Sequence, residues 1–305
     1  MTDHHPEDVL QSRFAPVLAT LEAERRVIVD RNYTILCISA GITAAGGLFG
    51  YDLNLPPLLI GAAVLGIVNY MVFANKGVGS WRLKYKHQVI DTIVNSFFGA
   101  DGAYQPNKGH PESDFLATQL FDRNPDRFHS EDLITGKVDK TLIAFSEVHA
   151  EYKTTNSKGQ TTWHTLFKGM IFSADFNKHF SGRTIVKQNS FWRFLKFGNT
   201  ELENPDFNAE FSVLADDPIE ARYILTPALM EKILQINRNW GGSLGLSFIH
   251  SQLHIAIPLR SNFFEASVWT KIDRSQQWQQ DWQIIAEMVS IVDDLDLNTR
   301  IWSKE

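Results

Sequence analysis

The chain has 305 residues, 44% of them apolar and 21% charged, with a net charge of −6 at pH 7 and one cysteine. Its length exceeds what one hydrophobic core usually holds, and its composition excludes wholesale disorder. The acidic charge, without clustered lysine and arginine, argues against nucleic-acid binding, and one cysteine excludes an intramolecular disulfide or a multi-cysteine zinc site.

Residues 1–32 are predicted to form an amphipathic, cytoplasmic N-terminal helix. Between Glu7 and Asp30 the apolar residues recur at helical intervals, at Leu10, Phe14, Val17, Leu18, Leu21 and Ile28. That spacing places the apolar side chains on one face of a helix and the mixed charges on the other. We expect the apolar face to pack on the folded domain, on a partner helix or on the membrane surface.

Residues 33–75 are predicted to form a transmembrane helical hairpin. The runs 33–50 and 56–74 contain no charged side chain. At about 1.5 Å per helical residue, each run covers roughly 27 to 29 Å, which is close to the thickness of the hydrocarbon core of a bilayer. The link 51–55 is too short to hold a domain, so the two helices must be antiparallel. The alternative is a helical hairpin buried in the core of a soluble protein.

Basic residues flank the outer ends of the two spans. The link offers only Asp52, whereas arginine and lysine precede the first span and follow the second, at Arg25, Arg26, Arg31, Lys76, Arg82, Lys84 and Lys86. The positive-inside rule therefore places both termini in the cytoplasm. The long polar segment before the first span, and the second span after it, argue against a secretory signal peptide.

Small residues recur at helical spacing on both spans, at Ser39, Thr43 and Gly47 and at Ala62 and Gly66. They allow close helix packing in lipid. The polar Asn69 has two interpretations. It makes a pore or ligand contact, or it makes an interhelical hydrogen bond or lies near the cytoplasmic headgroups. Two helices with so few polar groups cannot enclose a transport pathway unless many copies assemble. The hairpin is therefore interpreted as an anchor in the lipid bilayer.

Residues 76–305 are predicted to form a cytoplasmic α+β domain, an antiparallel sheet with helices. Apolar residues alternate with period two in the expected strands and with period about 3.6 in the expected helices. Gly77–Ser80 is expected to be a hinge. Helices are predicted at 85–98, 112–121, 226–237 and 275–295, and strands at 141–152, 161–173, 183–188, 207–214, 244–249 and 253–258.

The sequence predicts no catalytic residue, cofactor site or metal site. It lacks a phosphate-binding loop and an H-E-x-x-H helix, and GGSLG at 241–245 fits the letters of a nucleophile elbow but precedes a predicted strand. His250 and His254 are four residues apart on a predicted hairpin, where that spacing does not bring two ligands to one metal. Cys37 lies in the first predicted span, away from any base.

An aromatic and basic segment follows the strand predicted at 183–188. It contains Phe191, Trp192, Arg193, Phe194 and Lys196. This composition is typical of a contact with the membrane interface or with the groove of a partner. The alternative is a core strand or a linker packed on the sheet.

Six separated motifs occur in order: EDLITG (131–136), FSEVHAEY (145–152), LFKGMIFSADFNKHFSGRTIV (166–186), EARYILTPALMEKIL (220–234), SFIHSQLHIAIP (247–258) and DDLDLNTRIW (293–302). Together they resemble the bacterial family known as domain of unknown function 3137. The resemblance covers about residues 85–302, and the two-span hairpin is similar to that family's usual layout. It implies a location in the bacterial inner (cytoplasmic) membrane and suggests a LemA-like membrane protein as a partner. It supplies no activity, cofactor or catalytic residue.

These observations favour a membrane-anchored cytoplasmic interaction module that binds a protein partner or a membrane-proximal ligand. The absence of catalytic signatures favours a protein that is not an enzyme. Two alternatives stay open. One is a membrane-associated hydrolase whose site forms only in the fold, and the other is a lipid-sensing domain that uses the segment around Trp192.

Overall fold

A computed structural model describes residues 6–53, 55–74, 76–176, 178–189, 200–259, 262–272 and 276–297. The contacts between residues divide the chain into two compact units. The first unit holds residues 1–90 and 264–280, and the second holds residues 91–263 and 281–305. Each unit is described by itself.

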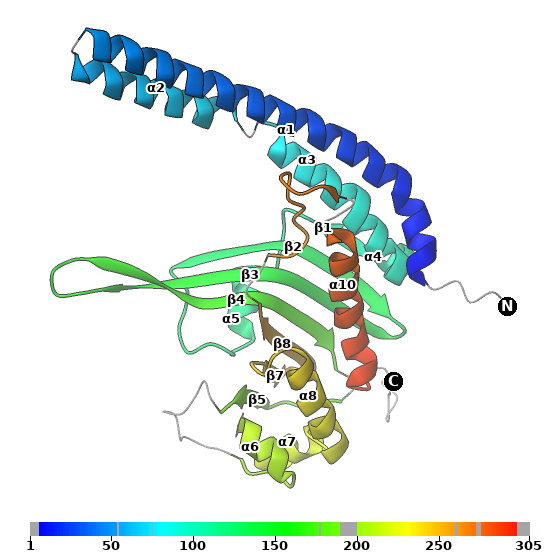
Figure 1. Cartoon of the computed structure of the whole chain (residues 1–305). Coiled ribbons are helices and arrows are strands. Elements are labelled where there is room, and N and C mark those ends of the chain that lie inside the picture. Colours follow the sequence, from blue (N-terminus) through cyan, green and yellow to red (C-terminus); the bar gives the residue numbers. More distant parts are fainter. Residues whose placement is uncertain are drawn as a thin grey trace. The chain divides into compact units, whose positions relative to one another are not determined.

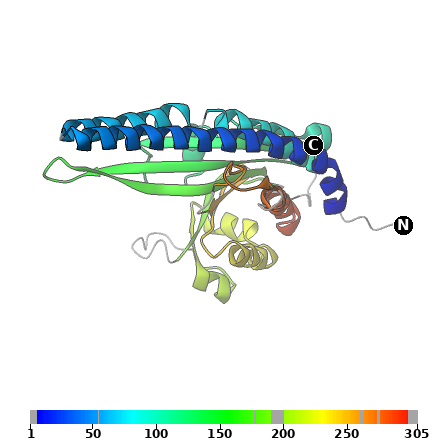
Figure 2. The same ribbon diagram turned by 45° about the horizontal axis from the view of Figure 1, so that its top comes forward.

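Two helices dominate the first unit. α1 runs without interruption through Pro6–Asp52, and α2 (Pro56–Phe73) returns antiparallel beside it (Figures 1 and 2). The amphipathic segment and the first apolar run predicted from the sequence are therefore parts of one helix. Pro57 lies in the first turn of α2, where a missing backbone N–H costs little.

Small and polar residues form the contact between α1 and α2. The side-chain amide of Asn69 donates a hydrogen bond to the Ser39 hydroxyl across 2.9 Å. A Cβ atom added at Gly66 would lie 2.8 Å from the Ser39 carbonyl oxygen and 2.2 Å from the Thr43 hydroxyl, so the two backbones approach closely there. Of the interpretations of Asn69, the structure shows the interhelical hydrogen bond, and it confirms the predicted packing through Gly66.

The outer surface of this hairpin is apolar and exposed. Two helical stretches, Phe14–Asp52 and Ile60–Asp101, are long and apolar enough to cross a membrane. In their most apolar parts only 11% and 18% of the residues are buried, whereas the core helix of a soluble protein would be mostly buried. Most large apolar side chains that are exposed among the described residues lie between Tyr33 and Phe73. This burial does not fit the alternative of a hairpin buried in a soluble core.

The N-terminal half of α1 packs against segments distant in the sequence. The buried Arg25 donates hydrogen bonds to the Val268 carbonyl oxygen at 2.8 Å and to the Glu22 carboxylate at 2.7 Å. The indole N–H of Trp81, in α3 (Val78–Tyr85), donates to the Leu21 carbonyl oxygen at 2.9 Å. The apolar face of this helix is therefore covered by the protein itself.

The Glu22 carboxylate accepts several hydrogen bonds. It accepts from Arg25, from Arg26 and from the Ile272 backbone N–H. These hydrogen bonds, that of Arg25 above all, lower the pKa of Glu22 from 4.5 to about 2. The Phe14 ring, 5.3 Å from the Trp278 ring, closes the packing at the start of the helix.

The second unit is built on an eight-stranded antiparallel sheet with the order β1-β2-β3-β4-β8-β7-β5-β6 (Figure 1). The strands are β1 (Ala103–Gln105), β2 (Arg127–Val138), β3 (Thr141–Thr155), β4 (Thr161–Asp175), β5 (Arg183–Gln188), β6 (Phe211–Ala215), β7 (Gly245–Ile249) and β8 (Gln252–Pro258). The α+β prediction is confirmed, as are the hairpin β3–β4 and the pair β7–β8.

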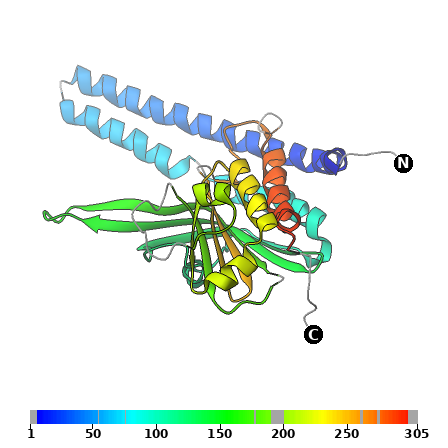
Figure 3. The ribbon, with the colours of Figure 1, turned by 90° about the horizontal axis from the view of Figure 1, so that it is seen from below.

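The β3–β4 hairpin is the longest part of the sheet and extends beyond the neighbouring strands (Figures 1 and 3). The Asn156 side chain fixes its turn by accepting from the backbone N–H groups of Lys158 and Gln160, both at 3.0 Å. Gly159 adopts φ 76° in this turn, a backbone conformation that suits glycine. The turn residues identified in the sequence therefore make the hairpin.

Apolar side chains from one face of this sheet form a core cluster with Phe115 of α5 (Glu112–Ala117). Its strand members are Val148, Ala150, Phe167, Ile171, Ile185 and Ala256. Because side chains alternate along a strand, Glu147, His149 and Lys168 project from the opposite face. The register of β3 and β4 therefore places the apolar side chains on one face of the sheet and the charged side chains on the other.

Three helices of this unit begin with the same local signal, a capping side chain followed by proline. They are α6 (Pro205–Glu210), α7 (Pro218–Ile224) and α8 (Pro227–Asn239), capped by Asn204, Asp217 and Thr226. The strand predicted at 207–214 was therefore partly wrong, because Asn204 and Pro205 start a helix and the strand begins only at Phe211. The prediction of Thr226 as the cap of α8 is confirmed.

The remaining helices belong partly to the first unit and partly to the second. η1 (Lys86–Ile90) is a short π-helix that continues α3, and α4 (Asp91–Phe98) and the short 3₁₀ turn η2 (Gly99–Asp101) follow it. α10 (Gln277–Asp294) matches the predicted terminal helix. The expected hinge at Gly77–Ser80 was wrong, since α3 begins at Val78 directly after Gly77, which has φ 84°.

The contact of α1 with α2 generates a prediction that uses two glycines of one helix. Gly66→Ala should lower the unfolding temperature of the full-length protein in detergent, because the new methyl group meets a backbone oxygen, a strain of about 1–3 kcal/mol. Gly61→Ala is the matched control, since nothing lies within 4 Å of its added Cβ; it should be neutral or stabilising by up to about 1 kcal/mol. Equal effects of the two substitutions would refute the close approach at Gly66.

Candidate functional site

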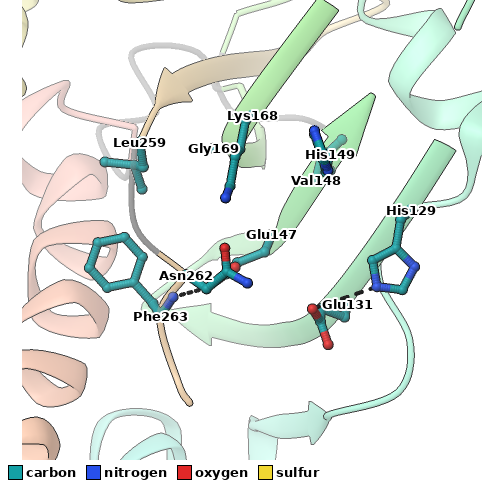
Figure 4. Close-up of a pocket in the computed structure, with 10 residues that line it drawn as sticks. All are labelled: His129, Glu131, Glu147, Val148, His149, Lys168, Gly169, Leu259, Asn262 and Phe263. Carbon is teal, nitrogen blue, oxygen red and sulfur yellow. Dashed lines mark hydrogen bonds and ion pairs between the residues drawn. The ribbon is translucent and has the colours of Figure 1, made fainter. Parts of the chain in front are cut away.

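A charged recess lies on the face of the sheet opposite the core cluster. Its volume is about 90 Å³, and it opens between β2, β3, β4 and the chain that follows β8 (Figure 4). The lining residues are His129, Glu131, Glu147, Val148, His149, Lys168, Gly169, Leu259, Asn262 and Phe263. We call this feature the charged recess.

Strand register brings the titratable side chains of the recess together. His129 of β2 lies directly opposite His149 of β3, which lies opposite Lys168 of β4. One step along the same face, Glu131 lies opposite Glu147. Directly opposed residues have Cβ atoms about 5 Å apart, so the three strands present two adjacent rows of polar side chains.

Local interactions hold the two carboxylates. The Nε2 atom of His129 lies 3.6 Å from Oε1 of Glu131, and Glu147 accepts a hydrogen bond from the Phe263 backbone N–H. The β2–β3 register shifts directly after Glu131, where Asp132 has φ 59°. Such bulges turn the strand and re-aim side chains, which here ends the row at Glu131.

The recess offers one ammonium group, two carboxylates and two imidazoles that open to water. It can therefore bind a polar or charged group by complementary hydrogen bonds and ion pairs. Its small volume and its exposed histidines differ from the deep pocket with converging acid and base groups that a hydrolase needs.

Two buried serine–histidine pairs lie elsewhere on the sheet. Nδ1 of His254 lies 2.9 Å from the Ser173 hydroxyl, and Nδ1 of His110 lies 2.7 Å from the Ser146 hydroxyl. Burial lowers the pKa of both histidines, that of His254 to about 4 with a further contribution from His110. Within the described residues, Nε2 of His110 has no hydrogen-bond partner, so this pair lacks the orienting acid of a catalytic triad.

The structure separates the two histidines that the sequence places four apart. His254 is buried on β8, whereas His250 is exposed in the turn between β7 and β8 with φ 51°. Among the residues that the structure describes, no group of three or more histidine, cysteine, aspartate or glutamate side chains could hold a metal ion. The predicted contact residues Phe191, Trp192, Arg193, Phe194 and Lys196 lie outside the described residues.

Sequence reasoning missed the charged recess, although a signal was present. His129 and Glu131 are two residues apart, as are Glu147 and His149, so each pair falls on one face of a strand. The second pair lies in a strand that was predicted, but β2 was not. Without β2 and its register, the two pairs could not be placed side by side.

Residues 165–297 match the model of a family described as "Protein of unknown function (DUF3137)". This confirms the family resemblance over the matched residues, and the motifs at 131–136 and 145–152 lie outside them. No curated protein matches the chain.

One solved structure with some similarity is the "crystal structure of the mycobacterial trehalose monomycolate transport factor A, TtfA", with 10% sequence identity and a TM-score of 0.36. That comparison covers 72% of this chain and 97% of the other. A likeness at this level supports no inference about function.

The burial of His254 generates a prediction about acid stability. The folded state holds its pKa near 4 instead of 6.5, so it favours the neutral imidazole. The resulting stabilisation is complete above pH 6.5 and is lost as the pH falls toward 4. The urea concentration at the unfolding midpoint should fall between pH 7 and pH 4.5, which is about this pH range. It should fall less in His254→Gln than in the natural chain.

The exposed His250 provides the control for this measurement. His250→Asn removes a histidine at a left-handed position that asparagine tolerates, and the pH dependence of His254→Gln is compared with that of this variant. An unaltered pH dependence in His254→Gln would contradict the assignment.

Proposed function

We propose, from the premise that residues 165–297 carry a domain of the DUF3137 family, that the chain is an interaction module anchored in the bacterial inner membrane. The α1–α2 hairpin is the anchor, with both termini in the cytoplasm. The sheet unit binds a protein partner through the charged recess. No enzymatic step is required.

The exposed apolar surface of the hairpin carries this proposal. Between Tyr33 and Phe73 many exposed side chains are large and apolar, while the Asn69 amide donates a hydrogen bond to Ser39 at the contact of the two helices. Exposing apolar surface to water costs a free energy of about 25 cal/mol for each Å². A bilayer supplies the surroundings that this surface needs.

The charged and aromatic flanks support the same arrangement. The Lys76 ammonium lies 4.5 Å from the centre of the Phe73 ring at the end of α2, a pairing suited to a membrane boundary. Beyond the apolar part of α1, Arg25 and Trp81 are buried in contacts with the protein and need no lipid. In this proposal, the membrane segment ends where the exposed apolar surface of α1 changes to the covered amphipathic surface.

The charged recess supports the binding of a partner more than that of a free metabolite. It is small and open, and its two rows of side chains present both signs of charge on one face of the sheet. Charged rows of this kind favour one orientation of a partner with the complementary pattern. A LemA-like membrane protein is one candidate for that partner.

Topology can be tested with an impermeant maleimide on intact spheroplasts. Cys37→Ala removes the natural thiol, and either Asp52→Cys in the link or Lys158→Cys in the β3–β4 turn then supplies one new exposed thiol. We expect labelling of Asp52→Cys alone until the cells are lysed, after which both react. Labelling of Lys158→Cys in intact spheroplasts would exclude a cytoplasmic sheet unit.

Partner binding can be tested by affinity purification of the full-length protein from gently solubilised membranes, followed by mass spectrometry. A partner should be lost when residues 77–305 are removed. It should also be reduced about tenfold by the combined variant His149→Ala, Lys168→Ala, because a central contact is worth more than about 1 kcal/mol.

The control for the recess variant is Lys137→Ala, Lys140→Ala, which changes exposed lysines near the β2–β3 turn. It should retain the partner. Recovery of the same partner with the recess variant would assign the interaction to another surface, and a chain purified without any partner would refute the interaction module.

A further inference from the structure

One edge of β4 has no neighbouring strand where the β3–β4 hairpin extends beyond β8 (Figure 3). β4 begins at Thr161, but β8 pairs with it only from Gly169 onward. Within the part of the chain that the structure describes, no backbone group outside β3 hydrogen-bonds to the backbone of residues 161–167. We call residues 161–167 the free edge.

The pairing with β3 shows which backbone groups of the free edge point outward. In an antiparallel pair, residues that bond to the neighbouring strand alternate with residues whose N–H and C=O groups point away from it. The Lys153 N–H of β3 donates to the Asp126 carboxylate at 2.8 Å, on the side away from β4. Trp163, directly opposite Lys153, therefore points its own backbone groups away from β3. Thr161 and Thr165, two residues away on each side, do the same.

The free edge lacks the charged side chains and the proline that usually protect an exposed strand from pairing. Its residues read TTWHTLF, without lysine, arginine, proline or an acidic residue. Threonine and aromatic residues are common in strands because they pack well on a pleated surface. The composition of the free edge therefore favours pairing with a further strand.

A hollow of about 720 Å³ lies beside the free edge. Its β4 lining includes Phe167, from the face of the core cluster, and Thr165, which lies opposite Glu151 on the other face. Pro258 and Leu259, at the end of β8, also line it. Because the hollow borders both faces of β4 and the end of β8, it occupies the place that a neighbouring strand would fill. We call it the edge hollow.

The wall of the edge hollow on the core side is apolar and is held by buried residues. It includes Phe121, Trp240 and Leu244. The Phe121 ring is stacked at 4.3 Å on the fully buried Phe115. The buried Asn237 side chain accepts from the Leu244 backbone N–H at 3.2 Å. The hollow is therefore preformed and can take apolar side chains.

We propose that an extended segment of the partner protein lies in the edge hollow and pairs with the free edge as an additional antiparallel strand. A polypeptide backbone supplies alternating donors and acceptors at the spacing that the free edge requires. Side chains of the added strand point alternately to the two faces of the sheet. Those on the core side are apolar and contact Trp240 and Leu244. The inference rests on the proposed function, because it states how the partner is held.

A second copy of this chain fits the edge hollow less well than a single strand of a partner. If two free edges paired antiparallel about Trp163, the turn 156–159 of each copy would lie beside Phe167 of the other. That turn is polar and exposed, so it would meet an apolar wall. A single extended segment with alternating apolar side chains avoids this mismatch.

Proline at an outward-pointing position tests the pairing. Thr165→Pro removes one N–H donor of the free edge and leaves the hydrogen bonds to β3 in place, as proline does on edge strands. Thr165→Val is the matched control, because it keeps the donor and favours a strand. In affinity purification of the full-length protein, Thr165→Pro should recover about tenfold less partner than Thr165→Val, because an acceptor on the added strand loses its hydrogen bond. Equal unfolding temperatures would show that both variants fold.

Hydrogen exchange gives a second readout that does not require the partner to be identified. Backbone amides of residues 161–167 should exchange about tenfold more slowly in inner-membrane vesicles than after purification in a detergent that removes the partner. Thr165→Pro should abolish this difference, and Thr165→Val should keep it. The amide of Lys158 in the exposed turn is the internal control and should exchange equally in both preparations.

The outcomes separate this inference from the proposed function. Equal recovery of a partner with Thr165→Pro and Thr165→Val would refute the added strand and leave the charged recess as the interface. Slow exchange that persists after purification and disappears on dilution would assign the free edge to a second copy, which refutes a partner strand. A chain without a partner and without slow exchange at the free edge would refute both.

Discussion

The register of the β3–β4 hairpin is the constraint on which both surface features of the sheet unit depend. With Ala150 opposite Phe167, the apolar side chains of both strands join one core, and His149 and Lys168 share the other face. A slip of one residue would exchange the two faces and bury charged groups. The turn at Asn156 and the side chains buried under Phe115 together select the observed register.

The β3–β4 hairpin borders two hollows of the sheet unit because it extends beyond the neighbouring strands. On the side of β2 it carries the rows of the charged recess, and on the side of β8 its overhang borders a larger cavity lined by Phe167, Trp240 and Leu244. Lys168 and Leu259 line both hollows.

In the first unit, a single helix is adapted to two kinds of surroundings. Around Leu21 and Arg25, α1 is covered by the indole of Trp81 and by the chain near Val268. Farther along, α2 packs against it through Gly66 and Asn69. The buried Arg25 is hydrogen-bonded in the first half, and the half-buried Asn69 pairs with Ser39 in the second, as polar groups away from water usually are. This division is the basis of the proposed anchor.

The sequence by itself determined the features that depend on neighbouring residues: the two apolar runs, the turn at Asn156, the cap and proline of α8 and the α+β class. Its motifs also resemble those of the family whose model matches residues 165–297. Tertiary structure decided the features that depend on distant residues, including the contact of Arg25 with Val268 and the rows that join His129 to Lys168. Local periodicity predicts which face of a helix or strand a side chain occupies. Strand register and packing decide which distant segments that face contacts. The sequence therefore predicted the elements and could not predict the hollows between them.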